Sequence, residues 1–268
     1  MLLKRLLTAS IIAPISVVGI LMLNQTGFAL ALALILIISS WEYCNLIQIK
    51  SLAGKTLYTS LVLVITYFLT NEPSSLAMVL YAAAIWWIIA LFYVVSYPKD
   101  SSTLSKILAI KLINGFFLFV PMAISLMAIH LQDRALVLFL LVLIWAADVG
   151  AYFAGRAYGK NKLCPAVSPG KTLEGVYGGI ALSQLVAISY VYISIQTPSV
   201  NDFLMFCFLS LSVALVSVLG DLFESVLKRI AKVKDSGKLL PGHGGLLDRI
   251  DSLTSSAPIF FLLFIFLI

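Results

Sequence analysis

The chain has 268 residues, of which 61% are hydrophobic and 11% are charged, and its formal net charge is +6. A soluble domain is about 45–50% apolar and about 25% charged, because it needs a polar surface. The composition therefore excludes an ordinary soluble enzyme and indicates that lipid is the solvent for much of the chain. The three cysteines, Cys44, Cys164 and Cys207, are scattered and odd in number, which favours neither a disulfide framework nor a zinc cluster.

The N-terminus begins with Lys4 and Arg5 in front of a long apolar run. A cleaved signal peptide is one interpretation, since Ala29-Leu30-Ala31 matches the small-residue pattern of a cleavage site. The apolar run is long for a signal peptide and continues past this triplet. A retained first membrane span therefore fits better.

Apolar runs of membrane-spanning length recur along the whole chain. A transmembrane helix needs about 20 mostly apolar residues, which predicts an all-α, polytopic integral membrane protein with about nine transmembrane helices. The predicted spans are 6–23, 28–46, 56–70, 75–97, 112–130, 135–153, 174–195, 203–220 and 252–268. We interpret residues 1–134 as scaffold and lipid-facing helices, and residues 135–268 as a catalytic transmembrane region with cytoplasmic loops.

The basic residues divide unevenly between the two sides that these spans define. One side receives all of the 18 lysines and arginines except Arg134. The other side also carries the acidic Glu72, Asp133 and Asp202. Because cytoplasmic loops carry the excess of basic residues, the N-terminus is predicted to be cytoplasmic. The two longest polar stretches, 154–173 and 221–251, fall on the same predicted cytoplasmic side.

The first group of residues with chemical potential begins at Asp148, inside the sixth apolar run, and ends at Lys160. A charged residue at a helix centre costs about 2.5–3.5 kcal/mol, so Asp148 needs a partner, a polar cavity or a metal. An ion pair with Arg156 or Lys160 near the interface is the simpler alternative. Otherwise Asp148 is expected to face a polar cavity or a metal ion.

The second group runs from Ser168 to Gly175 and contains Gly170-Lys171-Thr172. A P-loop would need a glycine where Pro165 stands, and no strand is predicted in front of it, so the pattern is rejected as a P-loop. Hydroxyls, a flexible glycine and a lysine at the start of a helix still suit phosphate oxygens. Helix capping by Ser168 or Thr172 is the alternative.

The third group continues the eighth span. Asp221, Glu224, Ser225 and Lys228 have the spacing of one helical face, although a solvated amphipathic helix end would look similar. A glycine-rich segment then leads to a further pair of carboxylates, Asp248 and Asp251. The start of a helix attracts carboxylates in any case. Yet Asp221, Asp248 and Asp251 fall at one membrane level beside basic residues, which suits Mg²⁺ bound together with a phosphate substrate.

This last region resembles the signature of the phosphatidate cytidylyltransferase (CDP-diacylglycerol synthase) family. The matching residues are Ser225-x-Leu227-Lys228-Arg229-x4-Lys234-Asp235-x-Gly237-x2-Leu240-Pro241-x-His243-Gly244-Gly245-Leu246-x-Asp248-Arg249-Ile250-Asp251. The stretches 148–162 and 168–175 also resemble that family, so the likeness is close over about residues 140–255. Residues 1–134 are similar to it only in hydropathy and number of spans.

The resemblance implies transfer of CMP from CTP to phosphatidic acid, in a multi-pass protein of a bacterial-type inner membrane with a cytoplasmic active site. The expected cofactor is Mg²⁺, with a second metal ion left open, held by Asp221, Asp248 and Asp251. Expected partners are CTP, phosphatidic acid and membrane lipid, with no nucleic acid; a homodimer is left open. The catalytic candidates are Asp221, Asp248, Lys228 and Arg249. The substrate-binding candidates are Asp148, Arg156, Ser168, Lys171, Thr172, Ser225 and His243.

Two other classes of protein remain open on the sequence. A transporter would more often carry ionisable groups near the bilayer midplane, with broken helices in paired repeats. Another CTP-dependent membrane enzyme, such as a polyprenol kinase, would move the γ-phosphoryl group and not CMP. The spacing of the glycines and aspartates after residue 241 favours the cytidylyltransferase over both alternatives. This preference rests on the resemblance alone.

Overall fold

The computed structural model describes residues 2–72, 74–98, 107–240, 242 and 244–267. Nine helices and one short hairpin account for most of this part of the chain. The helices are α1 (Leu2–Met22), α2 (Gln25–Leu46), α3 (Leu52–Thr70), α4 (Ser75–Ser96), α6 (Leu108–Gln132), α7 (Arg134–Tyr158), α8 (Leu173–Ser194), α9 (Val200–Ala231) and α10 (Leu247–Leu267). The strands are β1 (Lys162–Cys164) and β2 (Ser168–Thr172).

The predicted all-α, polytopic class is confirmed. Within the described residues, eight helices, all of the set except α1, are long and apolar enough to cross a membrane. Helix α1 contributes the shorter apolar stretch Ala13–Met22. The chain is therefore a multi-pass membrane protein whose helices follow the predicted spans. Most ends differ by about five residues or fewer, but α9 extends to Ala231, beyond the predicted end at residue 220.

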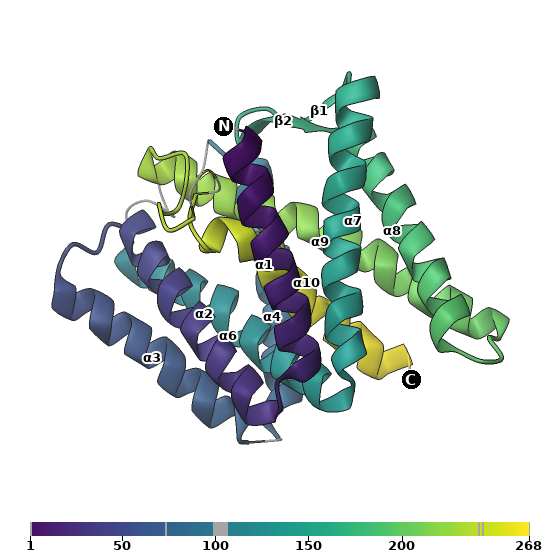
Figure 1. Cartoon of the computed structure of the whole chain (residues 1–268). Coiled ribbons are helices and arrows are strands. Elements are labelled where there is room, and N and C mark those ends of the chain that lie inside the picture. Colours follow the sequence, from purple (N-terminus) through teal and green to yellow (C-terminus); the bar gives the residue numbers. More distant parts are fainter. Residues whose placement is uncertain (1, 73, 99–106, 241, 243, 268) are drawn as a thin grey trace.

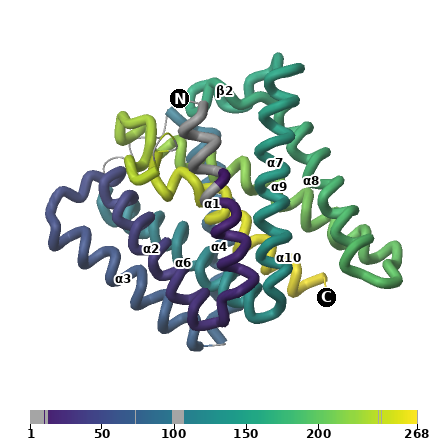
Figure 2. The backbone as a smooth tube through the Cα atoms, viewed as in Figure 1, coloured from purple at the N-terminus to yellow at the C-terminus, as the bar shows by residue number. Residues whose placement is uncertain are grey.

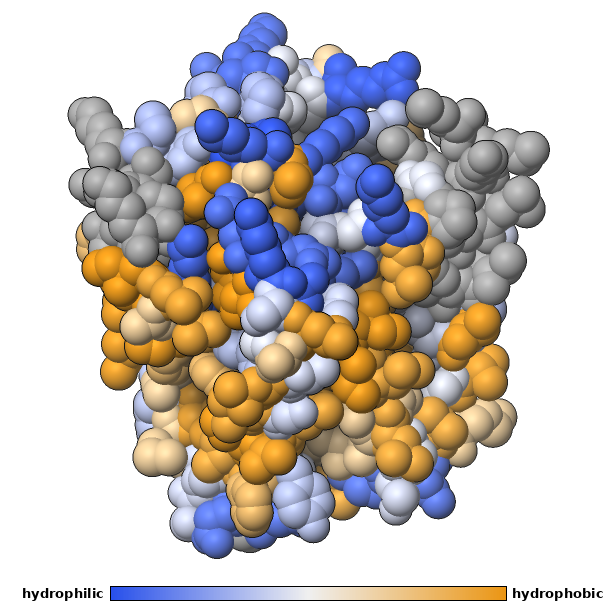
Figure 3. Space-filling view, turned by 90° about the vertical axis from the view of Figure 1, so that its left-hand side faces the viewer, coloured by the Kyte–Doolittle hydropathy of each residue, from blue (hydrophilic) through white to orange (hydrophobic). Residues whose placement is uncertain are grey.

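The polar parts of the molecule gather at one end. Figure 1 shows that α1 begins at the same end of the bundle as the β1–β2 hairpin, whereas α10 ends at the opposite end. In the space-filling view of Figure 3, hydrophobic residues form a broad band, and hydrophilic residues are concentrated above it. This distribution suits helices that cross a bilayer with most polar segments on one side. The cytoplasmic assignment of that side stays a prediction.

Small residues bring α7 and α8 into close contact. A Cβ atom added at Gly150 would overlap the Gly178 carbonyl, and one added at Gly179 would lie 2.7 Å from the Ala147 carbonyl. Small side chains allow membrane helices to approach closely, which compensates for the absence of a hydrophobic driving force in lipid. Figures 1 and 2 show the two helices side by side, with α9 passing behind them.

Helix α9 is a single helix of 32 residues that carries the third group of candidate residues. It begins at a capping box formed by Ser199 and Asp202, and it ends at Lys232, which has a left-handed backbone conformation. Serine side chains of α10 bind its backbone: Ser252 Oγ donates to the Ser217 carbonyl at 3.1 Å and Ser255 Oγ to the Val216 carbonyl at 2.7 Å. These bonds fix α10 along the half of α9 that leads into the candidate site.

The β1–β2 hairpin corrects one expectation. No strand was predicted before Lys171, yet Ser168–Thr172 pairs antiparallel with Lys162–Cys164. Arg229 Nε donates to the Val167 carbonyl at 3.0 Å, which ties the hairpin turn to α9. The P-loop pattern still fails at Pro165, and Lys171 itself lies inside the strand.

Candidate active site

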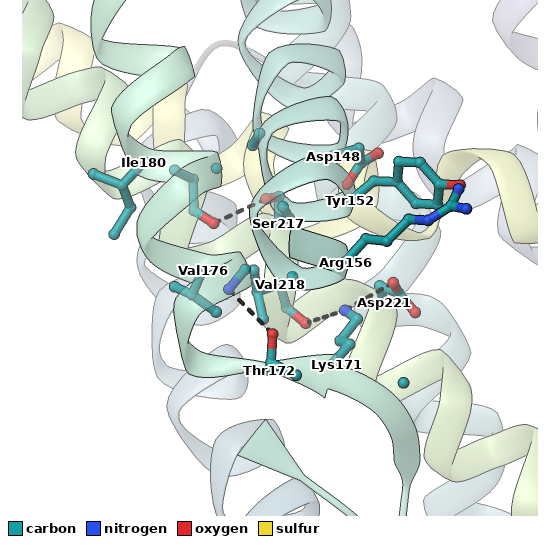
Figure 4. Close-up of a pocket in the computed structure, with 17 residues that line it drawn as sticks. Asp148, Tyr152, Arg156, Lys171, Thr172, Val176, Ile180, Ser217, Val218 and Asp221 are labelled. Carbon is teal, nitrogen blue, oxygen red and sulfur yellow. Dashed lines mark hydrogen bonds and ion pairs between the residues drawn. The ribbon is translucent and has the colours of Figure 1, made fainter. Parts of the chain in front are cut away.

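A cavity of about 450 Å³ opens between α7, β2, α8 and α9 (Figure 4). Its wall is polar where Asp148, Tyr152, Arg156, Lys171 and Asp221 meet. The remaining wall is formed by small or apolar residues, which include Ala147, Ala151, Val176, Gly179, Ile180, Ala214 and Val218. The cavity therefore combines charged groups with an apolar surface at the level of the membrane-spanning helices.

An ion pair joins the second and third groups of candidate residues. Lys171 Nζ lies 2.7 Å from Asp221 Oδ2, and it also donates to the Val218 carbonyl at 3.4 Å. The side chains of Lys171 and Asp221 are 23% and 34% exposed, so both reach the cavity. Ser225 Oγ donates to the other oxygen, Asp221 Oδ1, at 3.3 Å. Strand β2 and helix α9 thus present one cation and one carboxylate to the same space.

The first group faces this pair from α7. Asp148, Tyr152 and Arg156 follow one another at four-residue intervals and so share a helical face, as the side chains in Figure 4 show. Arg156 Nη1 donates to Tyr152 Oη at 3.0 Å. Asp148 lies within electrostatic reach of Asp221, Lys171 and Arg249. In the described part of the chain Asp148 forms no ion pair, so the expected alternative, pairing with Arg156 or Lys160, is not observed.

Thr172 and Glu174 have structural partners beside the cavity. Thr172 is the N-cap of α8, where its Oγ1 accepts from the Gly175 amide at 3.1 Å. Thr172 lines the cavity but is only 5% exposed. Its hydroxyl is engaged in capping α8 and offers little surface to a ligand. Glu174 accepts from the Lys160 and Asn161 amides and closes the connection after α7. Ser168 starts β2 opposite Cys164 and lies outside the cavity lining.

A second charged cluster lies further along α9. Lys228 Nζ is 2.9 Å from Glu224 Oε2 and 2.8 Å from Asp248 Oδ1. All three side chains are largely buried, with 13% of Lys228, 3% of Glu224 and 5% of Asp248 exposed. Asp248 Oδ2 accepts from the Ser236 and Gly245 amides at 2.9 and 2.8 Å, so the loop before α10 orients this carboxylate. Burial makes the ion pairs costly to break, because a charge left alone would have no solvent.

The two clusters are joined through Asp251. Gly220 allows α10 to approach α9, since a Cβ atom there would lie 2.5 Å from the Asp251 carbonyl. The Asp251 carboxylate lies within electrostatic reach of Asp221, Asp148 and Lys228. Its Oδ1 accepts only from the Ser252 amide, at 2.9 Å, among the hydrogen bonds of the described residues. Asp251 Oδ2 therefore has no hydrogen-bond partner among the described residues, whereas both Asp221 oxygens are engaged by Lys171 and Ser225.

Comparison with known proteins identifies the family. The family model described as "Cytidylyltransferase family" matches residues 3–267. The chain belongs to the cytidylyltransferase family. It is 37% identical to the phosphatidate cytidylyltransferase of Haemophilus influenzae over an alignment of 289 positions, gaps included, that covers all of both proteins. It is 38% identical to that of Pseudomonas aeruginosa over 97% of this chain and 96% of the relative. It is 32% identical to that of Thermotoga maritima over 97% of this chain and 95% of the relative.

The predicted resemblance is confirmed over the full length and not only from residue 140 onward. In this cytidylyltransferase, residues from α7, β2, α9 and α10 meet around the two clusters. Arg249 is exposed beside Asp148, without a hydrogen bond to its side chain in the described part of the chain. The prediction for His243 lies outside the described residues.

The structure also brings forward residues to which the sequence assigned no role. Glu224 was expected only on the face of α9, yet it is 2% exposed and its Oε1 has no hydrogen-bond partner among the described residues. Glu42 was expected to belong to the scaffold, but its carboxylate reaches the loop before α10. A polar residue in an otherwise apolar span was the only sequence signal for Glu42.

Proposed function

We propose that this chain transfers CMP from CTP to phosphatidic acid, giving CDP-diacylglycerol and pyrophosphate. The family and the names of its full-length relatives support this activity. The single observation that carries the proposal is the Lys171–Asp221 pair in a cavity whose other wall is apolar. A lipid phosphate needs a cationic partner for its headgroup and an apolar surface for the adjoining chains.

The reaction joins two anions, so charge repulsion is the barrier that the protein must lower. An oxygen of the lipid phosphate forms a bond to the α-phosphorus of CTP, and the bond from that phosphorus to the bridging oxygen of the β-phosphate breaks. The lipid phosphate is already ionised near neutral pH and needs no strong base. Catalysis of such a transfer is mostly positioning and electrostatic stabilisation.

The basic side chains of the cavity would bind and orient the phosphates. Arg156 suits bidentate contact with a phosphate, whereas Lys171 acts as a point charge beside it. Asp221 orients Lys171 in the free protein. Lys228 and Arg249 do not line the cavity, but they lie within electrostatic reach of Asp251 and Asp148, respectively, and we assign them to the nucleotide phosphates. Ser225 positions Asp221 through its hydroxyl.

Mg²⁺ is the proposed cofactor, and the acidic residues fit it. Among the described residues, no group of three or more His, Cys, Asp or Glu side chains forms a metal cage. Magnesium ions usually bind one or two carboxylates together with substrate phosphates and water, so a complete cage is not required. Without a ligand, Lys171 and Ser225 contact the two Asp221 oxygens, and Lys228 contacts Asp248 Oδ1. Asp251 Oδ2 has no hydrogen-bond partner among the described residues. Asp221, Asp248 and Asp251 would hold the ion once Lys171 and Lys228 contact the phosphates instead. When bound, the ion would neutralise the phosphates and align them.

The rival activities receive less support. Neither a polyprenol kinase nor a transporter is favoured by the full-length family match. The bacterial relatives support a location in a bacterial membrane, and the excess of basic residues on the side of the cavity supports a cytoplasmic orientation. A reporter fused after residue 268 is expected on the outer side, and one inserted at residue 238 on the cytoplasmic side. The reverse pattern would contradict this orientation. A homodimer and a second metal ion stay predictions.

Pyrophosphate release tests the activity. Purified protein in detergent, supplied with CTP, phosphatidic acid and Mg²⁺, is expected to release pyrophosphate. Release should stop when the lipid is omitted or the metal is chelated, and it should return when each is restored. Release of CDP without pyrophosphate would favour a kinase, and release of pyrophosphate without lipid would contradict transfer to phosphatidic acid.

A further inference from the structure

Glu42 is a buried carboxylate in the N-terminal half of the chain that contacts the start of the last helix. It lies near the end of α2 and is 6% exposed. Its Oε2 accepts from the backbone amide of Leu247 at 2.9 Å. Leu247 is the first residue of α10, so its amide is one of the donors that a helix leaves unsatisfied at its N-terminus. Glu42 thus caps α10 from another helix.

The loop before α10 closes tightly around this carboxylate. A Cβ atom added at Gly237 would overlap Glu42 Oε1, and one added at Gly245 would overlap Oε2. Glycine is the residue that lets backbone approach a ligand or side chain so closely. The Glu42 carboxylate therefore leaves no room for a side chain at Gly237 or Gly245, two glycines of the family signature.

From this loop the contacts continue to the catalytic candidates. The Ser236 hydroxyl lies 3.4 Å from Glu42 Oε2 and 2.9 Å from Asp248 Oδ2. The Ser236 and Gly245 amides donate to the same Asp248 oxygen. Asp248 Oδ1 then binds Lys228. The single proton of the Ser236 hydroxyl can go to only one of the two carboxylates at a time, and Asp248 is the nearer. A chain of close polar contacts therefore runs from Glu42 through Ser236 and Asp248 to the lysine of α9.

The charge of Glu42 has no direct counter-ion in the described part of the chain, where none of the ion pairs includes it. Its stabilisation comes from backbone and hydroxyl donors and from the positive end of the α10 dipole. A purely structural helix contact could be made by an apolar side chain at lower cost, because a buried charge needs several donors. The position of Glu42 is therefore better explained by the geometry that it imposes on the loop.

We propose that Glu42 is a positioning residue for the reaction, which holds the loop and the start of α10 so that Asp248 and Lys228 keep their orientation. This inference rests on the proposed function. Glu42 acts through the Leu247 amide and through Ser236, and it does not touch the reactants. What the site requires at this position is a hydrogen-bond acceptor at the correct distance.

Three substitutions of Glu42 test the inference. Glu42→Ala removes the acceptor, Glu42→Gln keeps an acceptor oxygen at the same distance, and Glu42→Asp keeps the charge but withdraws the carboxylate from Leu247. The matched control is Ser40→Ala, on the same helix as Glu42. It removes a buried hydrogen bond to Thr59 of α3 without touching the loop. CMP transfer is measured together with hydrogen exchange of peptides that cover residues 232–248.

The expected result separates the variants. Glu42→Ala lowers kcat about 100-fold, as expected for a displacement of about 1 Å in a catalytic group. It also accelerates exchange in residues 232–248. Glu42→Gln restores slow exchange and leaves kcat within about threefold of the parent protein, while KM for CTP changes little in all variants. Ser40→Ala behaves like the parent protein in both measurements.

Three results would overturn the inference: parental kcat and exchange in Glu42→Ala, a Glu42→Gln protein as impaired as Glu42→Ala, or equal losses in Ser40→Ala. If Glu42→Ala gives no folded protein, Glu42→Asp tests the inference instead. Parental kcat in Glu42→Asp would show that the distance from the carboxylate to the Leu247 amide does not matter, which would overturn the inference. Absence of CMP transfer in the parent protein would contradict the proposed function alone, because the exchange measurement still reports on the loop.

Discussion

Replacement of Lys171 by methionine tests whether the cavity acts through charge. Lys171 Nζ lies 2.7 Å from Asp221 Oδ2 and its side chain is 23% exposed. A unit charge about 4 Å from a phosphate is worth about 4 kcal/mol at an effective dielectric constant of about 20. Screening by water at this exposure leaves about 2.7 kcal/mol, which corresponds to a loss of about 100-fold in kcat/KM. Because partly exposed ion pairs contribute only about 0–1 kcal/mol to folding, the unfolding temperature should change little.

The assay compares CMP transfer by Lys171→Met and Lys55→Met in the same detergent. Lys55 is a suitable control because it is another partly exposed lysine, bound to Asn45 Oδ1 at 2.5 Å and lying 5.4 Å from the Trp41 ring, away from the cavity. We expect the loss of activity only in Lys171→Met, with similar unfolding temperatures for both proteins. A Lys171→Met protein with parental kcat/KM, or equal losses in both variants, would refute the assignment of this cavity.

Three further substitutions address the metal, the buried cluster and the helix packing. Asp221→Asn should lower kcat about 100-fold or more and raise the Mg²⁺ concentration needed for half-maximal rate, and an unchanged Mg²⁺ dependence would remove Asp221 from the metal site. Lys228→Met should destabilise the protein by about 3–5 kcal/mol, measured by thermal unfolding in detergent, because it leaves buried carboxylates unpaired. Gly178→Ala should cost about 1–3 kcal/mol, because its Cβ would overlap that of Ala154, whereas Gly19→Ala has room and should be neutral. Equal stability of the two alanine variants would contradict the close packing of α7 on α8.

The helices could be predicted because each depends on local sequence. An apolar run of sufficient length has few alternatives in lipid, where backbone groups must be satisfied within the segment. The hairpin could not be predicted in the same way. Ser168–Thr172 has no alternation of apolar and polar residues, and its pairing with Lys162–Cys164 depends on the turn between them and on Arg229 of α9.

The candidate site was partly predictable for a related reason. The helix spacing predicted Asp221, Asp248 and Asp251 at one membrane level, whereas Asp148 and Lys171 were expected in the same site through the family resemblance. Their actual partners depend on how α7, α8 and α9 cross, which no short motif encodes. Thr172, for which both phosphate binding and capping were open, caps α8. Glu42 meets Leu247 across 205 positions of sequence, so only the folded chain reveals its role.

The fate of the individual phosphates of CTP tests the central claim most directly. Two parallel reactions with phosphatidic acid and Mg²⁺ would use CTP labelled at either the α- or the γ-phosphate, followed by separation of lipid from water-soluble products. The account predicts that the α-label enters the lipid as CDP-diacylglycerol and that the γ-label leaves as pyrophosphate. A γ-label recovered in the lipid, with the α-label left in CDP, would contradict CMP transfer and identify a kinase.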